Sequence, residues 1–309
     1  MVPEQVHRDT GEEIRRSLTE RGAFFVGGTM REYKSFYKTV GGNEGSKCKY
    51  PTRLDSYGCG CMHNCEYCYA RSLLEFRGLW RPEDPAVADL KKVRRKLQKI
   101  PAGTVLRLGG MTDCFQPIEK YCRITHKIIQ ELNRRMIGYL IVTKSALVAD
   151  DEYIKIYDPK LCHIQITITA TDDEKALEFE NASRISERIK AVEKLQRLGF
   201  DVSVRLSPFI PEYIDFDKLN AIRCDKILVE FLRSNGPIRK TFPIDYSEYT
   251  VKESGYRHLP LEKKKEYLSK ITGFKEVTVC EDETEAYEYW KHNFNPDPED
   301  CCNLRKAGA

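Results

Sequence analysis

The stretch Tyr57-Gly-Cys-Gly-Cys-Met-His-Asn-Cys-Glu-Tyr-Cys-Tyr-Ala-Arg71 carries the strongest signal in this chain. Cys61, Cys65 and Cys68 follow the spacing C-x3-C-x2-C, so one loop supplies three thiolates to a single metal group. A structural zinc site requires four ligands, and His63 lies inside the loop with poor reach to be the fourth. A four-iron cluster with three cysteine ligands keeps one iron open for a substrate or cofactor. The spacing therefore favours an iron–sulfur cluster.

The sequence GCGC offers two candidates for the first ligand of this loop. Spacing from Cys65 selects Cys61. Cys59 is then interpreted as a bystander thiol that faces the barrel.

Strand-like and helix-like segments alternate on the C-terminal side of the loop. Repeated alternation predicts parallel strands joined by right-handed crossovers. Six such units predict an α/β fold, as a partial (β/α)6 TIM barrel or an open doubly wound sheet, with chemistry at the C-terminal ends of the strands. The expected strands are Tyr50–Tyr57, Thr104–Met111, Gly138–Lys144, Cys162–Thr169, Asp201–Phe209 and Asp225–Leu232, and the expected helices are Asp89–Ile100, Arg123–Arg135, Asp151–Tyr157, Ser186–Leu198 and Asp215–Ile222.

We expect three parts along the chain: an N-terminal arm (1–47), a barrel core (48–234) and a C-terminal α/β extension (235–309). The arm is rich in charges and glycine breaks. Within the extension, residues 235–260 hold tyrosines and basic side chains and form a possible substrate-binding segment. The rest is expected to hold the helix Leu261–Phe274, the strand Glu276–Cys280 and the helix Asp282–His292.

Composition narrows the class of protein. The 309 residues are 41% hydrophobic and 32% charged, with a net charge of +4 that does not by itself indicate nucleic-acid binding. No stretch has the apolar length of a bilayer span, and the N-terminus lacks the apolar core of a secretory signal, so we expect an intracellular protein without a membrane partner. Twelve cysteines in such a chain favour metal ligation or thiol chemistry over disulfides.

The cysteine spacing, with Tyr67 directly before the last cysteine, resembles the signature of radical S-adenosylmethionine (SAM) enzymes. GCGCMHNCEYCYAR (58–71), LGGMTDCFQPIEKYCRITHKII (108–129), IVTKSALVADD (141–151) and VSVRLSPFIP (202–211) resemble spore photoproduct lyase and its relatives. The resemblance implies a partial TIM barrel, one [4Fe-4S] cluster, S-adenosylmethionine, and an external reductant such as flavodoxin or ferredoxin. It also implies that S-adenosylmethionine is cleaved to a 5′-deoxyadenosyl radical that takes hydrogen from the substrate.

The same resemblance implies further cofactor-binding residues. Gly109, Gly110 and Met111 match the segment that binds the methionine amino group, where glycine permits close backbone approach. In the resemblance Lys144 lies near the cofactor carboxylate, and a lysine at a buried strand end also needs a partner.

Five other candidates line the expected rim less specifically. Ser145, Thr167 and Thr169 supply hydroxyl groups, although β-propensity alone also explains the two threonines. Arg205 contacts the cofactor or substrate, or forms a core salt bridge. Tyr67 is counted among the cofactor-binding residues.

Two groups of cysteines depart from the family pattern. Cys114 follows the second strand, and we expect it to be a catalytic hydrogen-atom donor or radical relay, or else a small buried hydrophobe. Together with Cys48 or Cys122, three C-terminal cysteines are candidates for an auxiliary cluster, with reduced thiols as the default. These three are Cys280, Cys301 and Cys302.

The lyase resemblance points to a damaged or modified thymine base in DNA, through repair by a lyase or rearrangement of a hypermodified thymine by an isomerase. The aromatic and basic segment Arg233–His258 suits an extruded base and its phosphates. A radical SAM enzyme acting on a peptide or small metabolite is the alternative. A zinc or redox-sensing module that binds nucleic acid is the least expected.

Overall fold

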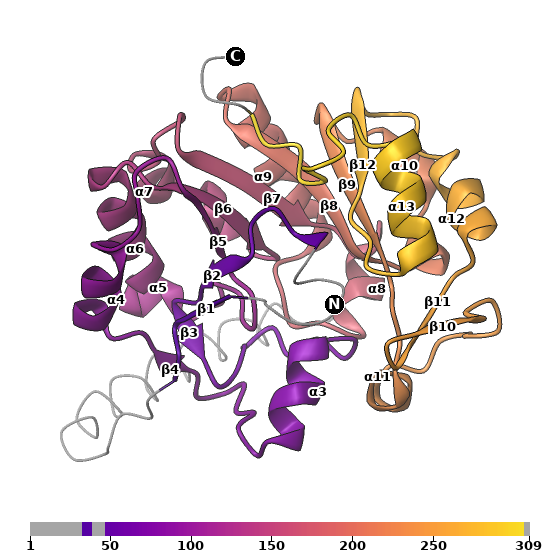
Figure 1. The fold of residues 1–309 in the computed structure, drawn as a ribbon, viewed down its shortest axis with the longest axis horizontal. Helices are drawn as coiled ribbons and strands as arrows, with labels where there is room; N and C mark the ends of the chain where they lie inside the picture. The colour runs from indigo at the N-terminus through magenta and orange to yellow at the C-terminus, as the bar shows by residue number, and fades with distance from the viewer. Residues whose placement is uncertain (1–32, 39–46, 306–309) are drawn as a thin grey trace, which may run out of the picture. The chain divides into compact units, whose positions relative to one another are not determined.

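The computed structural model describes residues 33–38 and 47–305 (Figure 1). Its centre is an eight-stranded sheet in the order β1-β2-β5-β6-β7-β8-β9-β12. Every neighbouring pair from β2 to β12 is parallel, and β1 adds an antiparallel edge. The predicted α/β class is confirmed. These strands are β1 (Phe36–Lys38), β2 (Thr52–Leu54), β5 (Val105–Leu108), β6 (Gly138–Thr143), β7 (Cys162–Thr167), β8 (Asp201–Phe209), β9 (Lys226–Phe231) and β12 (Glu276–Val279).

Helices follow the strands and cover the sheet, as the alternation predicted. They are α3 (Tyr69–Phe76), α4 (Leu90–Leu97), α5 (Glu119–Cys122), α6 (Ile124–Arg134), α7 (Asp151–Ile154), α8 (Asp173–Leu177), α9 (Ile185–Arg197), α10 (Phe216–Asn220), α11 (Gly236–Thr241), α12 (Leu261–Leu268) and α13 (Thr284–Asn293), with the 3-10 turns η1 (Ala146–Ala149) and η2 (Pro211–Tyr213). Two small antiparallel pairs complete the structure: β3 (Tyr57–Gly58) with β4 (Ala86–Val87), and β10 (Val251–Glu253) with β11 (Tyr256–His258).

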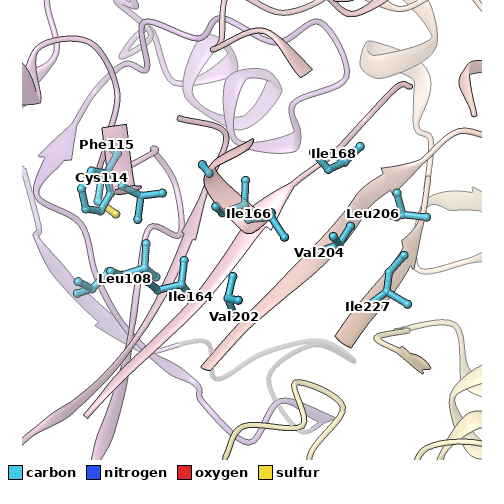
Figure 2. Close-up of a cluster of buried hydrophobic side chains, with 14 of the residues drawn as sticks. Leu108, Cys114, Phe115, Ile164, Ile166, Ile168, Val202, Val204, Leu206 and Ile227 are labelled. Atoms are coloured by element: carbon cyan, nitrogen blue, oxygen red, sulfur yellow. The ribbon is translucent and has the colours of Figure 1, made fainter. Parts of the chain in front are cut away.

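The sheet and its helices enclose one main hydrophobic core. Alternate side chains of the central strands meet apolar faces of the helices, and Figure 2 shows Leu108, Ile164, Val202 and Val204 at its centre. β7 is buried along its whole length, as expected for a parallel strand covered on both faces. Among the described residues, no helix is long and apolar enough to cross a bilayer.

The boundaries of the expected parts need refinement. The arm contributes an edge strand, because β1 pairs with β2; residues 1–32 and 39–46 of the arm lie outside the described residues. In the C-terminal extension, β12 pairs in parallel with β9 and therefore continues the central sheet. Helices α3 and α11 and the β10–β11 hairpin were not anticipated, since short elements leave a weak periodic signal.

Candidate functional site

A cavity of about 220 Å³ lies at the carboxyl ends of the parallel strands. We call residues 58–71, which carry Cys61, Cys65 and Cys68, the cluster loop. The cavity brings these three cysteines together with the segments that follow β5 and β6 and with side chains of β7, β8 and β9. The candidates on its wall are Cys61, Cys65, Tyr67, Cys68, Gly109, Gly110, Met111, Lys144, Thr167 and Arg205.

The three loop thiols are spaced too widely for a single ion. Among the described residues, only His258, Glu281 and Asp282 bring three potential ligand atoms within 4.8 Å of one another. A tetrahedral zinc ion holds its sulfur ligands about 3.8 Å apart. A cluster binds each thiolate to a different iron and so accepts the wider spacing.

His63 is turned toward partners other than the loop thiols. Its Nε2 lies 3.3 Å from Oδ2 of Asp113, and its Nδ1 lies 3.2 Å from the carbonyl oxygen of Asn181. The loop therefore has three thiols and no fourth ligand from its own histidine. Burial raises the pKa of Cys61 to about 12, so metal binding there releases protons.

The backbone of the loop is held from three sides. The side-chain oxygen of Gln116 accepts a hydrogen bond from the Met62 amide (2.8 Å), and the Glu66 amide donates to the Phe179 carbonyl (3.0 Å). A Cβ on Gly60 would lie 2.0 Å from the carbonyl oxygen of Arg81, so this position accepts no larger residue without a backbone shift. These contacts fix the loop in advance of metal binding.

A buried carboxylate, Glu180, anchors the cluster loop through the Tyr67 hydroxyl. It accepts hydrogen bonds from the hydroxyls of Tyr67 and Thr169 and pairs with Arg188, which is 1% exposed. Burial alone would raise its pKa, but Arg188 and Lys144 lower it. Tyr67 thus presents its ring to the cavity and its hydroxyl to Glu180, and the Thr169 hydroxyl is directed to Glu180 as well.

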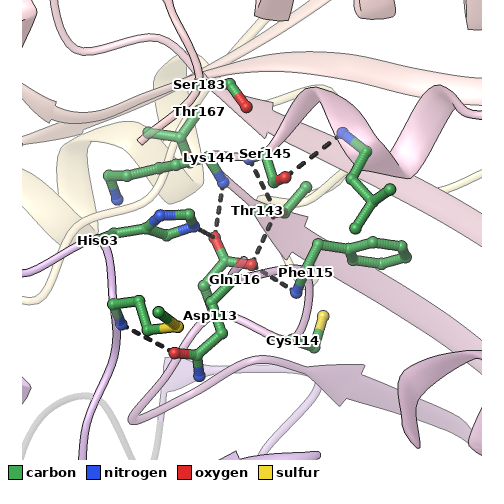
Figure 3. Close-up of polar contacts among 12 residues, drawn as sticks. His63, Asp113, Cys114, Phe115, Gln116, Thr143, Lys144, Ser145, Thr167 and Ser183 are labelled. Carbon is green, nitrogen blue, oxygen red and sulfur yellow. Dashed lines mark hydrogen bonds and ion pairs between the residues drawn. The ribbon is translucent and has the colours of Figure 1, made fainter. Parts of the chain in front are cut away.

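Asp113 organises the end of β6 (Figure 3). Its carboxylate accepts hydrogen bonds from the Thr143 hydroxyl and the Lys144 amide, both at 2.7 Å, and from the Phe115 amide at 2.8 Å. Burial opposes its ionisation, but His63 and these donors lower its pKa to about 2. The ionised Asp113 carboxylate therefore fixes the position of the Lys144 backbone. The Lys144 ammonium lies 5.5 Å from the centre of the Tyr67 ring.

Asp55 likewise fixes the backbone of the segment that follows β5. Its two oxygens accept hydrogen bonds from the amides of Gly110 (2.7 Å) and Met111 (3.0 Å). Gly109 adopts a φ of +82°, and a Cβ there would lie 3.0 Å from the Val142 carbonyl. With the two amides occupied, the segment keeps carbonyl oxygens for an ammonium group, of which that of Gly110 already accepts from the Tyr69 hydroxyl at 2.6 Å.

Arg205 forms the core salt bridge that the sequence left open, and it also lines the cavity. It pairs with Glu230 and donates to the Gln165 side chain at 2.6 Å, while the Ser207 hydroxyl donates to Glu230 at 2.8 Å. Burial would raise the pKa of Glu230, but Arg205 and neighbouring arginines lower it to about 2. The pair places a carboxylate acceptor on the wall.

Four candidates lie outside the cavity lining, and one of them is Thr169, whose hydroxyl donates to Glu180. Cys114 is fully buried in the core beside Phe115 (Figure 2), which favours the small buried hydrophobe over a hydrogen-atom donor at the cavity. Consecutive residues point in opposite directions here, and Asp113 takes the cavity side. The Ser145 hydroxyl accepts from the Leu147 amide (3.3 Å) and begins η1 instead of lining the wall. Cys59 is likewise outside the lining.

Sequence reasoning missed the carboxylates that position this site: Asp55, Asp113, Glu180 and Glu230. Each is an acidic residue at or near the end of a strand or in a tight loop, where exposure is the usual expectation. Their roles depend on partners far away in the chain, which no local pattern identifies.

Comparison with known proteins identifies a matching family and a relative. The model of the radical SAM superfamily matches residues 56–222. The uncharacterized protein MJ0683 of Methanocaldococcus jannaschii is 30% identical over 166 residues, which cover 51% of this chain and 60% of that protein. The chain therefore spans less than two thirds of the length of this curated relative.

Solved structures share the fold at low identity. A cysteine-to-serine mutant of spore photoproduct lyase matches with a TM-score of 0.58 at 17% identity, over 87% of this chain and 93% of that one. A second mutant, with bound AdoMet (S-adenosylmethionine) and dinucleoside spore photoproduct, matches with a TM-score of 0.54 at 16% identity over the same shares. The predicted partial TIM barrel is confirmed.

Proposed function

The chain belongs to the radical SAM superfamily, and from that premise we propose that it starts radical chemistry on a damaged or modified thymine base in DNA. The cofactors of this superfamily are a [4Fe-4S] cluster and S-adenosylmethionine, which when bound supply the one-electron cleavage that gives a 5′-deoxyadenosyl radical. The observation that carries the proposal is the meeting of Cys61, Cys65 and Cys68 with the 109–111 segment and Lys144 in one cavity.

The residues of the wall have separate tasks in this proposal. The three thiols hold the cluster, and the carbonyl oxygens of the 109–111 segment accept from the methionine ammonium of the cofactor. Lys144, held through its amide by Asp113, faces the cofactor carboxylate. Glu230 supplies an acceptor for hydroxyl groups.

The substrate class is supported by a basic hollow beside the β10–β11 hairpin. This second hollow, of about 260 Å³, is lined by Arg239, Lys252 and Arg257. Arg233 lines the main cavity and lies over the rings of Tyr69 (5.7 Å) and Tyr256 (5.0 Å), and Tyr256 belongs to the hollow. Cations that hold phosphates beside rings that stack on bases suit an extruded nucleotide.

Isotope transfer tests the whole proposal. Reduced, iron-loaded protein is incubated with S-adenosylmethionine and DNA carrying deuterium on the thymine methyl or ring, with normal, irradiated and hypermodified thymine as separate substrates. We expect deuterium in 5′-deoxyadenosine from one of the altered substrates. Absence of transfer from every DNA, into 5′-deoxyadenosine or into recovered S-adenosylmethionine, would overturn the substrate. Absence of both 5′-deoxyadenosine and labelled S-adenosylmethionine would overturn the radical chemistry. The product then separates lyase from isomerase.

The hollow is tested by binding. Replacing Arg239 and Lys252 with alanine should reduce the salt dependence of DNA binding by about two phosphate contacts. Lys91 and Lys92 on α4, replaced in the same way, are the matched control and should leave the slope unchanged. If DNA affinity depends on salt concentration equally in the two double variants, the hollow does not bind the DNA phosphates.

A further inference from the structure

The described structure gathers four cysteines outside the cluster loop. Cys48, Cys280 and Cys301 line the same cavity as the loop thiols, and Cys302 adjoins Cys301 in the chain. None of them forms a disulfide. The chemistry proposed above uses none of them.

These cysteines lie where the two ends of the parallel sheet meet. We call this region the closing seam and define it as residues 47–50, 280–282 and 297–303. The Tyr50 hydroxyl donates to Asp300 at 2.6 Å, and the Lys47 ammonium donates to the Asp282 carbonyl at 2.7 Å. The segment before β2 is therefore tied to both segments that follow β12.

The C-terminal segments of the seam are fixed to the sheet as well. The Cys280 amide donates to the Val229 carbonyl of β9 at 2.9 Å, continuing the ladder of β12. The Lys226 ammonium donates to the Asn303 carbonyl at 2.8 Å, and the Asn303 side chain donates to Glu276. The four cysteines are thus set on a fixed frame.

The thiols interact with one another. The Cys301 thiol lies within hydrogen-bonding distance of the thiols of Cys280 and Cys302. The Cys48 thiol is also within electrostatic reach of Cys280 and Cys302. All four sulfur atoms therefore share one neighbourhood.

We propose that Cys48, Cys280, Cys301 and Cys302 bind a second iron–sulfur cluster, of the four-iron type, in the closing seam. Four cysteine thiolates are the usual ligand set of such a cluster. Among the described residues, no three of these thiols come within 4.8 Å of one another.

Two further observations fit a thiolate-bound cluster there. Arg107 and Arg205 lie within electrostatic reach of Cys302 and offset negative charge. Nε of Arg107 is buried and lacks a hydrogen-bond partner in the described structure, so a cluster sulfur would satisfy it. The other candidate for a fourth ligand, Cys122, sits on α5 beside Glu119, outside the cavity wall.

Metal analysis tests the site without depending on the radical reaction. The full chain is reconstituted anaerobically with iron(II) and sulfide, and iron, sulfide, zinc and the EPR spectrum of the reduced protein are measured. We expect about eight irons per chain in the native protein and about four in a variant with Cys61, Cys65 and Cys68 replaced by alanine. The retained cluster should show its own EPR signal.

Matched variants locate the second cluster. Cys280→Ser with Cys301→Ser should lower the native iron content by about four, whereas Cys122→Ser should leave it unchanged. Circular dichroism checks that each variant is folded. About four irons in the native protein would overturn the proposal, even if a variant fails to fold. So would zinc in the seam, or complete loss of iron from a folded loop variant.

Discussion

The cluster loop and the closing seam bring cysteines to one cavity by different routes. In the loop, Cys61, Cys65 and Cys68 are close in sequence, and one turn of chain presents them together. In the seam, the cysteines come from positions 48, 280, 301 and 302, and contacts such as Tyr50 with Asp300 bring them together. A site of the first kind can be read from spacing, whereas a site of the second kind exists only when the sheet has formed.

The two regions also differ in what holds them. The loop rests on charged groups that the protein covers completely, with Glu180 and Arg188 at its base. Contacts of the seam are partly exposed, such as Lys49 with Asp297, where the ammonium and carboxylate are 3.9 Å apart. We therefore expect loop substitutions to act strongly on both stability and chemistry.

The largest effect should follow from removing one thiol of the loop. Cys65→Ala should eliminate the loop cluster and reduce S-adenosylmethionine cleavage to background, because the remaining two thiols cannot complete the ligand set. Iron content and 5′-deoxyadenosine yield measure this. Cys59→Ser, on the same loop but outside the cavity wall, should retain both. Normal cleavage by Cys65→Ala would break the comparison between loop and seam.

The support beneath the loop should show the next largest effect. Glu180→Gln leaves Arg188 buried without its partner, which costs about 3–5 kcal/mol in the free energy of unfolding. Denaturant titration measures the change. Glu178→Gln breaks an exposed pair with Lys175 and should cost less than about 1 kcal/mol. Similar losses in the two variants would show that the loop does not rest on a buried ion pair.

Acid should lower the free energy of unfolding by protonating Asp113, which lies beside the cluster loop. Its pKa in the folded protein is about 2, below the ordinary value of 3.8, so its stabilising contribution is present above pH 4 and is lost as the pH falls toward 2. The loss amounts to about 2 kcal/mol. Urea unfolding between pH 4 and pH 2 should show this decline in the native protein.

Asp113→Asn should be less stable at pH 7 and should lack that part of the acid-dependent decline. Asp217→Asn, which changes an exposed carboxylate on α10, serves as the control and should keep it. Parallel curves for the native protein and Asp113→Asn would assign the acid sensitivity to other groups.

The smallest effect is expected for Cys114, a thiol that belongs to neither region. Its side chain is fully buried in the core, so Cys114→Ala should cost about 1 kcal/mol of stability. Cofactor cleavage and product formation should remain at native levels. Normal cleavage with impaired product formation would instead restore Cys114 as a hydrogen-atom donor.

The elements that sequence patterns located best are long and regular. β8 spans Asp201–Phe209 as expected, and α9 spans Ile185–Arg197 against an expected Ser186–Leu198. In β8 the apolar residues Val202, Val204 and Leu206 alternate with polar residues along the strand, and α9 carries a clear helical period. Gly199, with a φ of +80°, follows the C-cap residue of α9, and glycine in this conformation commonly ends a helix.

Short or polar elements were harder to anticipate. The hairpin of β10 and β11 and the helix α11 have few residues and little periodicity. Their positions depend on long-range contacts, such as the hydrogen bond from the Thr241 hydroxyl to the Glu66 carbonyl at 2.8 Å. A sequence pattern does not contain that information.

The sequence by itself determined the ligand loop, the alternation of strands and helices, and the family that both resemble. Spacing of three cysteines and the period of apolar residues are local properties, so they survive without any knowledge of distant neighbours. The tertiary structure alone decided that Asp113 and Cys114 point to opposite sides, that Arg205 pairs with Glu230, and that the extension completes the sheet. The tertiary structure also decided that four cysteines meet in the closing seam, because burial and hydrogen bonding between distant segments are defined only after the chain has folded.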